Sequence, residues 1–163
     1  MIRPAILAAF ALFAAGSAFA QTAEEKRAID YGREIFKNKA QCQFCHKWDG
    51  SGDQGYGGNA LSLRSTQLTR EQMAMVVKCG RPGTGMPYHD QYAYTDKRCY
   101  GMDREMAGEN MPIAGINQTL NPSEIQSVVN YVFAEYVGRG PSTYDECVAF
   151  WGADTKQCEP MKK

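Results

Sequence analysis

The chain has 163 residues, of which 44% are hydrophobic and 22% are charged, and its formal net charge is zero. This length corresponds to one domain. The balanced charge, with no basic patch and no run of like charges, argues against a nucleic-acid-binding protein and against a charged tail.

Residues 1–20 have the pattern of a secretory signal peptide. Arg3 precedes an unbroken apolar run over residues 5–15, and the small residues Ala18 and Ala20 mark a cleavage site. The run is too short for a membrane span. The alternative to a cleaved signal peptide is an N-terminal anchor that the protein retains. We therefore expect a mature protein without a membrane span, in an oxidising compartment such as the periplasm.

The first predicted helix covers residues 23–39. Acidic residues occupy its first turn and basic residues its last, which suits the helix dipole. Five residues share one side at helical spacing: Ala28, Ile29, Gly32, Ile35 and Phe36. Glycine is costly inside a helix, so Gly32 on this apolar side predicts that another backbone approaches closely there.

Cys42, Cys45 and His46 form a CxxCH motif directly after this helix. Two thiols at this spacing can add to the vinyl groups of one porphyrin, while the adjoining imidazole coordinates the iron. A zinc site would need a second pair of ligands, and a dithiol redox motif would need a strand–helix setting. Neither is visible, so the motif predicts one covalently bound haem c.

The middle of the chain contains a loop, a helix and a second loop. Residues 48–58 are rich in glycine and predict a loop that passes near the flat ring, with Trp48 and Tyr56 available to cover it. Thr69 can cap a helix that ends at Gly80. The following loop, residues 81–87, contains Met86, whose thioether is a suitable soft ligand for haem iron.

Residues 88–120 lack helical or strand periodicity. A structureless segment of this length is uncommon in a compact domain, so we interpret it as a functional insertion that covers one haem edge. The helix over residues 122–137 is the clearest of the chain, because Asn121 can cap it and proline follows at its first position. A shorter helix is expected over residues 144–152.

Four of the six cysteines lie outside the motif: Cys79, Cys99, Cys147 and Cys158. They allow three disulfide pairings, and the sequence by itself does not choose among them. The local pairing, in which each cysteine bonds to its neighbour along the chain, is the simplest. Each such disulfide would contribute roughly 2 to 4 kcal/mol to stability.

The motif and its surroundings resemble the class I, mono-haem c-type cytochromes over residues 24–137. The matching features are Gly32 on the first helix, the CxxCH motif, the pair Met86-Pro87 after the middle helix, and Tyr131 on the last long helix. The resemblance implies an all-α, cytochrome c-like fold wrapped around one covalent haem. Along the chain we expect a signal peptide at 1–20, a cytochrome domain at 21–140 and a disulfide-tethered C-terminal extension at 141–163.

Three features depart from the family pattern. No proline follows the motif to hold the ring of His46, and the chain reads Gly57-Gly58-Asn59-Ala60-Leu61 instead. The segment before the last helix is long, and the four remaining cysteines are additional. The chain as a whole resembles periplasmic cytochromes that accept electrons from quinoprotein dehydrogenases.

Two methionines compete as the distal iron ligand. Met86 follows the middle helix as the resemblance requires, whereas Met111 lies at the right distance before the last helix. The continuous match from Leu68 to Pro87 favours Met86, and Met111 is the alternative. His89 is a third candidate, although a structural histidine is the simpler interpretation.

A His/Met iron has six ligands and no open position for a substrate, so we expect a one-electron carrier rather than an enzyme. Its partners would be a redox donor and acceptor, such as a quinoprotein dehydrogenase and a terminal oxidase. Two alternatives remain open: a haem subunit of a dehydrogenase complex, and a five-coordinate haem enzyme or sensor that binds a small ligand.

Overall fold

The computed structural model describes residues 22–108, 111–153 and 155–162. The predicted signal peptide, residues 1–20, lies outside the described residues. None of the helices within the described ranges has the length and apolar character needed to cross a bilayer.

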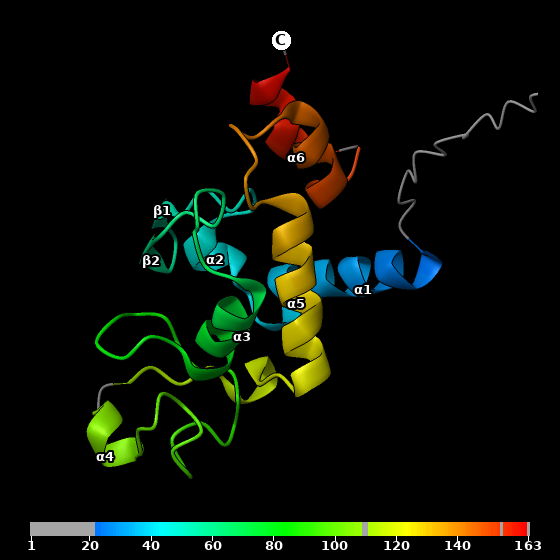
Figure 1. Cartoon of the computed structure of the whole chain (residues 1–163). Helices are drawn as coiled ribbons and strands as arrows, with labels where there is room; N and C mark the ends of the chain where they lie inside the picture. The colour runs from blue at the N-terminus through cyan, green and yellow to red at the C-terminus, as the bar shows by residue number, and fades with distance from the viewer. Residues whose placement is uncertain (1–21, 109–110, 154, 163) are drawn as a thin grey trace, which may run out of the picture.

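The chain is mainly helical, as predicted (Figure 1). The elements in order are α1 Ala23–Glu34, η1 Ile35–Lys39, α2 Gln43–His46, β1 Asp53–Gly55, β2 Gly58–Ala60, α3 Arg70–Cys79, α4 Arg104–Ala107, η2 Ile116–Gln118, α5 Pro122–Glu135, α6 Tyr144–Trp151 and η3 Lys156–Met161. The glycine-rich segment expected to be only a loop contains the antiparallel hairpin β1–β2.

Reciprocal side-chain caps start the helices where the sequence predicted them. The Thr69 hydroxyl accepts from the Gln72 amide while the Gln72 side chain accepts from the Thr69 amide, and Asn121 and Glu124 form the same arrangement at α5. The helix ends are less regular. α1 ends at Glu34 and continues as the wider π-helical turn η1 rather than as α-helix to residue 39.

α1 and α5 cross at Gly32 (Figure 1). A Cβ atom on this glycine would lie 2.1 Å from the Ser127 carbonyl oxygen and 2.7 Å from the Tyr131 Cβ. No side chain fits at these distances, so the crossing requires glycine. The prediction that a second backbone approaches Gly32 is confirmed.

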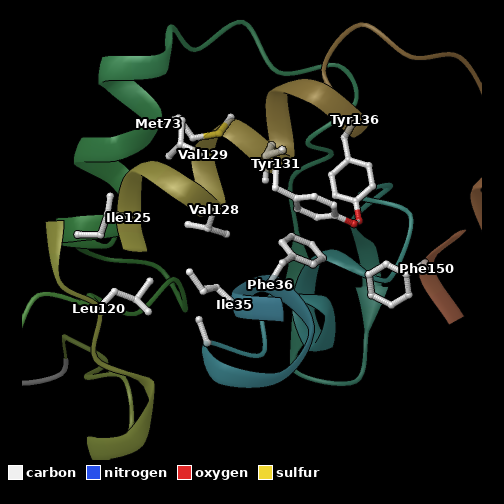
Figure 2. Packing of buried hydrophobic residues seen from close by; sticks show 12 residues of the cluster. Ile35, Phe36, Met73, Leu120, Ile125, Val128, Val129, Tyr131, Tyr136 and Phe150 are labelled. Atoms are coloured by element: carbon white, nitrogen blue, oxygen red, sulfur yellow. The ribbon is translucent and has the colours of Figure 1, made fainter. Parts of the chain in front are cut away.

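A hydrophobic core fills the space between α1, η1, α3 and α5 (Figure 2). The Phe36 ring packs 5.6 Å from the Tyr131 ring and 5.4 Å from the Tyr136 ring. The two tyrosine hydroxyl oxygens are 2.7 Å apart, and the Tyr136 hydroxyl donates to the Trp48 carbonyl at 2.6 Å. Burial raises the pKa of Tyr131 to about 12. The core thus anchors the backbone two residues beyond His46.

The insertion has its own small cluster of buried residues. Cys79, Tyr88, Ala93, Tyr94 and Cys99 form it, and Met102, Ala107 and Met111 pack against it. The insertion lies below α3 in Figure 1, away from the crossing of α1 and α5. The local disulfide pairing is confirmed, because Cys79 bonds to Cys99 and Cys147 bonds to Cys158.

The C-terminal segment returns to the core through α6. Phe150 belongs to the core cluster, and its ring lies 6.1 Å from the Trp48 ring. Arg64, which is almost fully buried, donates to both carboxylate oxygens of Glu146 at 3.1 Å. The Arg64 guanidinium also donates to the Gly140 and Asp49 carbonyls, so one side chain connects the loop after the motif with the C-terminal segment.

Candidate haem site

The CxxCH motif folds as a single helical turn. α2 lies between two residues with left-handed backbone angles, Gln41 at φ 55° and Lys47 at φ 60°. The His46 amide donates to the Cys42 carbonyl at 2.9 Å, which is the α-helical spacing. Residues three and four positions apart share one side of a helix. The two thiols and the imidazole are therefore presented to the same side of the turn.

The two motif cysteines are the ones left free by the disulfides. All six cysteines lie in the described residues, and Cys42 and Cys45 are the two without a disulfide partner. Cys42 packs against the hydrophobic core. Burial raises the pKa of its thiol to about 12, so the sulfur stays protonated at neutral pH. Both sulfurs are available for thioether bonds.

His46 is oriented by a backbone carbonyl. Its Nδ1 lies 3.1 Å from the Leu61 oxygen, and because a carbonyl only accepts, Nδ1 carries the hydrogen. This hydrogen bond leaves Nε2 unprotonated and free to bind iron. Burial lowers the pKa of His46, which favours the neutral imidazole that a metal requires. The structure thus supplies a partner for the ring, which the sequence left open.

The hairpin β1–β2 places that carbonyl, because Leu61 directly follows β2. The Gly57 amide donates to the Phe44 carbonyl at 2.9 Å, which fastens the hairpin to α2. A Cβ atom on Gly57 would lie 2.5 Å from the Cys45 sulfur, so any side chain there would displace the thiol. The glycine-rich segment therefore passes close to the motif. Tyr56 at the hairpin tip is fully exposed.

The structure brings the two Met-Pro pairs together. Tyr88 and Ile113 form a parallel bridge, with the Tyr88 amide donating to the Pro112 carbonyl and the Ala114 amide donating to the Tyr88 carbonyl. Both pairs also reach Gly80, where an added Cβ would lie 2.6 Å from the Met111 Cε and 2.7 Å from the Met86 carbonyl oxygen. The sequence could not indicate this arrangement, because 25 residues separate the two methionines along the chain.

The two methionines differ in their surroundings. Met111 packs against the buried cluster of the insertion. Met86 is half-buried in a turn closed by the hydrogen bond from the Arg81 amide to its own carbonyl, at 3.2 Å. The charge of Arg81, at the start of this turn, also contributes to the lowered pKa of His46, after burial.

His89 is held inside the insertion. It is 3% exposed, and its Nδ1 lies 2.8 Å from the Gln118 carbonyl oxygen. Burial lowers the pKa of His89, which keeps the ring neutral. These contacts are those of a structural histidine.

A surface groove lies beside the motif but does not include the candidate ligands. The groove measures about 770 Å³ and runs between the end of α1 and η2, with Lys39, Gln41 and Gln118 among its lining residues. None of Cys42, Cys45, His46 and Met86 lines it. The site is therefore defined by its donor groups rather than by this groove.

The donor set fits a c-type haem. Two free thiols and an imidazole with a free Nε2 share one side of α2, and a glycine hairpin leaves room for the Cys45 sulfur. Thioether bonds to the porphyrin require the thiols, and iron accepts imidazole nitrogen and thioether sulfur as axial ligands. When bound, the haem supplies one-electron exchange between Fe(III) and Fe(II).

Comparison with known proteins gives one match. Residues 27–105 match the family model described as "Cytochrome C oxidase, cbb3-type, subunit III". The matched range includes the CxxCH motif, α3 and Met86, and it ends before Met111. No curated protein and no solved structure matches the chain significantly. The matched family and the donor groups on α2 identify the chain as a c-type cytochrome with covalently bound haem c.

Proposed function

We propose that this protein is a periplasmic mono-haem electron carrier. Cys42 and Cys45 hold the porphyrin, His46 is the proximal ligand of the iron, and Met86 is the distal ligand. The observation that carries the proposal is the hydrogen bond from His46 Nδ1 to the Leu61 carbonyl, which frees Nε2 on the side that carries both thiols.

The proposed ligands favour electron transfer over catalysis. With imidazole on one face and thioether on the other, the iron keeps no position for a substrate, and methionine raises the reduction potential relative to a second histidine. The protein's own residues then orient the ligands and exclude water, and they do not react themselves. Leu61 orients the proximal ring, the core packed on Cys42 excludes water, and the Met86 turn presents a neutral soft ligand.

The covalent link is tested by mass and colour. The exported protein should weigh more than its amino acids by one haem, and it should keep its colour after denaturation in acid acetone. The variant Cys42→Ser/Cys45→Ser should lose the haem under these conditions. A colourless wild-type protein with the bare polypeptide mass would refute the proposal.

The distal ligand is tested by spectra of Met86→Ala and Met111→Ala, with the exposed Met106→Ala as the control. A weak far-red band in the oxidised protein is the usual mark of iron–methionine ligation in this family. We expect Met86→Ala to lose the band and become high-spin, while the other two variants keep it. Met86 lies within the range matched by the family model, and Met111 packs into the insertion cluster. A high-spin Met111→Ala beside a normal Met86→Ala would assign the ligand to Met111 instead.

The proposed processing follows the predicted boundaries. Residues 1–20 would be removed on export, and residues 21–140 would form the cytochrome domain. Residues 141–163 would form an extension; its disulfide Cys147–Cys158 lies within the extension, so it does not tether it as the sequence had suggested, and the contact between Arg64 and Glu146 holds it to the domain instead. Export is in keeping with the family, whose members usually work outside the cytoplasm. The mass of the intact protein should correspond to a chain that begins at Gln21, and a mass that includes residues 1–20 would contradict this cleavage.

A second candidate function is a haem subunit of a larger complex. The matching family description names a subunit of an oxidase, and the proposed partners include a terminal oxidase and a quinoprotein dehydrogenase. Purification from the native membrane and periplasm separates the two functions. A carrier elutes as a free protein of its own mass, whereas a subunit elutes with a catalytic partner.

A further inference from the structure

The insertion caps the end of α3. An α-helix leaves its last carbonyls without partners inside the helix, and these groups need other donors when they are buried. In this chain every donor comes from the insertion. The pairs are the His89 amide to Val77 at 3.2 Å, the Asp90 amide to Lys78 at 3.1 Å, the Tyr94 hydroxyl to Cys79 at 2.6 Å and the Tyr100 hydroxyl to Gly80 at 2.8 Å. We call these four donors the α3 cap.

The cap is itself fixed in place. The disulfide Cys79–Cys99 joins the end of α3 to the residue that precedes Tyr100, and both of its cysteines are fully buried. Tyr94 is also buried, and its ring packs 5.6 Å from the Tyr88 ring. The two hydroxyl donors therefore occupy defined positions.

The capped carbonyls lie directly before the Met86 turn. The last of them belongs to Gly80, and the turn begins at Arg81, whose amide closes it by donating to the Met86 carbonyl. At its far end the turn reaches Tyr88, which bridges to the segment that follows Met111. Either methionine is thus carried on backbone that the insertion holds at the end of α3.

We propose that the hydroxyl groups of Tyr94 and Tyr100 are positioning groups for the distal methionine. This proposal rests on methionine ligation of the iron. The methionine would leave ferric iron if its turn opened, and the turn starts at Arg81, directly after Cys79 and Gly80. Each tyrosine hydroxyl holds one of these two carbonyls, so each keeps the turn closed and the sulfur in place.

The test uses Tyr94→Phe, Tyr100→Phe and the double variant, with binding of imidazole to the ferric protein as the readout. Imidazole competes with methionine for the iron, so its apparent affinity follows the population of the open turn. Loss of the buried Tyr94 hydrogen bond should raise that affinity about tenfold. Loss of the Tyr100 hydrogen bond, which is only partly buried, should raise it less, and loss of both should raise it most. The far-red band should also disappear at a lower pH than in the wild type.

Two controls separate positioning from general destabilisation. Tyr92→Phe changes an exposed ring of the same insertion whose hydroxyl bonds to no other described residue, and it should leave imidazole binding unchanged. Val132→Ala removes buried methyl groups from α5, so it should lower the stability of the whole protein without raising imidazole affinity. Measuring unfolding of all variants gives the comparison.

The outcomes distinguish this proposal from the ligand assignment. If Met86→Ala and Met111→Ala both keep the far-red band, neither methionine is the ligand and the positioning role falls with that assignment. If one of them loses the band while the double tyrosine variant binds imidazole like Tyr92→Phe, the ligation stands and the positioning role is overturned. If Val132→Ala raises imidazole affinity as much as the tyrosine variants do, the effect is general stability and the positioning role is overturned as well.

Discussion

The core and the insertion are built from different interactions. Between α1 and α5, side chains fill the interior, and Phe36 and Val129 are almost completely buried. The insertion, residues 88–120, has a small buried cluster and depends on the Cys79–Cys99 disulfide and on donors to the carbonyls of α3. Core packing is distributed over many contacts, whereas the insertion depends on a few directional bonds.

The core is therefore expected to set the stability of the fold, whereas the insertion is expected to adjust the position of Met86. A change in the core is felt by most of the fold, because α1, η1, α3, α5 and α6 share the same interior. A change in the insertion acts first on the turn that carries Met86, because the two are adjacent at the end of α3. The four predictions below test this division, beginning with the largest expected effect.

The largest effect is expected from Gly32→Ala. The new Cβ would meet the Ser127 carbonyl at 2.1 Å, so α1 and α5 must move apart along the core. We expect a loss of at least about 3 kcal/mol in the free energy of unfolding, or no folded protein. Urea unfolding measures this loss. Gly140→Ala is the control, because nothing lies within 4 Å of its added Cβ. Equal stability of the two variants would show that the crossing is not tight.

Removal of each disulfide should separate the insertion from the C-terminal segment. Cys79→Ala/Cys99→Ala opens a loop of 20 residues and Cys147→Ala/Cys158→Ala one of 11 residues, so chain entropy predicts losses of about 3 kcal/mol, within about 0.5 kcal/mol of each other. The spectra should differ. The first pair lies beside the Met86 turn, so only its removal should weaken the far-red band. Equal spectral changes in both variants would contradict the separate roles of the insertion and the C-terminal segment.

Glu146→Gln tests whether the C-terminal segment belongs with the core. The Arg64 side chain is 8% exposed and faces this carboxylate, so the substitution leaves a nearly buried cation with a weaker partner. We expect a loss of about 1 to 2 kcal/mol and an unchanged spectrum. Glu159→Gln breaks the exposed pair with Lys162 and should change stability by less than about 0.5 kcal/mol. If the two variants behave alike in chemical unfolding, the Arg64 contact does not tie the segment to the core.

The smallest effect is expected from protonation of His89, which is buried in the insertion. Burial lowers the pKa of His89 below its ordinary value of 6.5, so the unfolded chain binds the proton more readily than the folded one. Stability from this group is therefore complete above about pH 6.5 and falls as the pH drops through the lower, folded pKa. His89→Asn keeps a donor for the Gln118 carbonyl and cannot be charged. The stability difference between wild type and variant should narrow between pH 7.5 and pH 5, and a constant difference would contradict this.

Several features followed from the sequence because they depend on neighbouring residues. Thr69 and Asn121 start their helices through side chains that bond three residues ahead, so the signal is contained in a few positions. The CxxCH motif is equally local, since one helical turn places its three donor groups on one side. Gly32 was informative for a related reason, because an expensive residue at a helix centre indicates what must pass beside it.

Other features arose only in the folded chain. The hairpin brings the Leu61 carbonyl to His46 across 15 residues, and a parallel bridge between Tyr88 and Ile113 brings the two Met-Pro segments together. The tyrosine hydroxyls of the insertion reach α3 across 15 and 20 residues. No periodicity or spacing encodes such contacts, because a backbone carbonyl is present at every position and geometry alone selects which one is used. The sequence thus determined the cofactor and the helices, whereas tertiary structure decided what holds the candidate ligands in place.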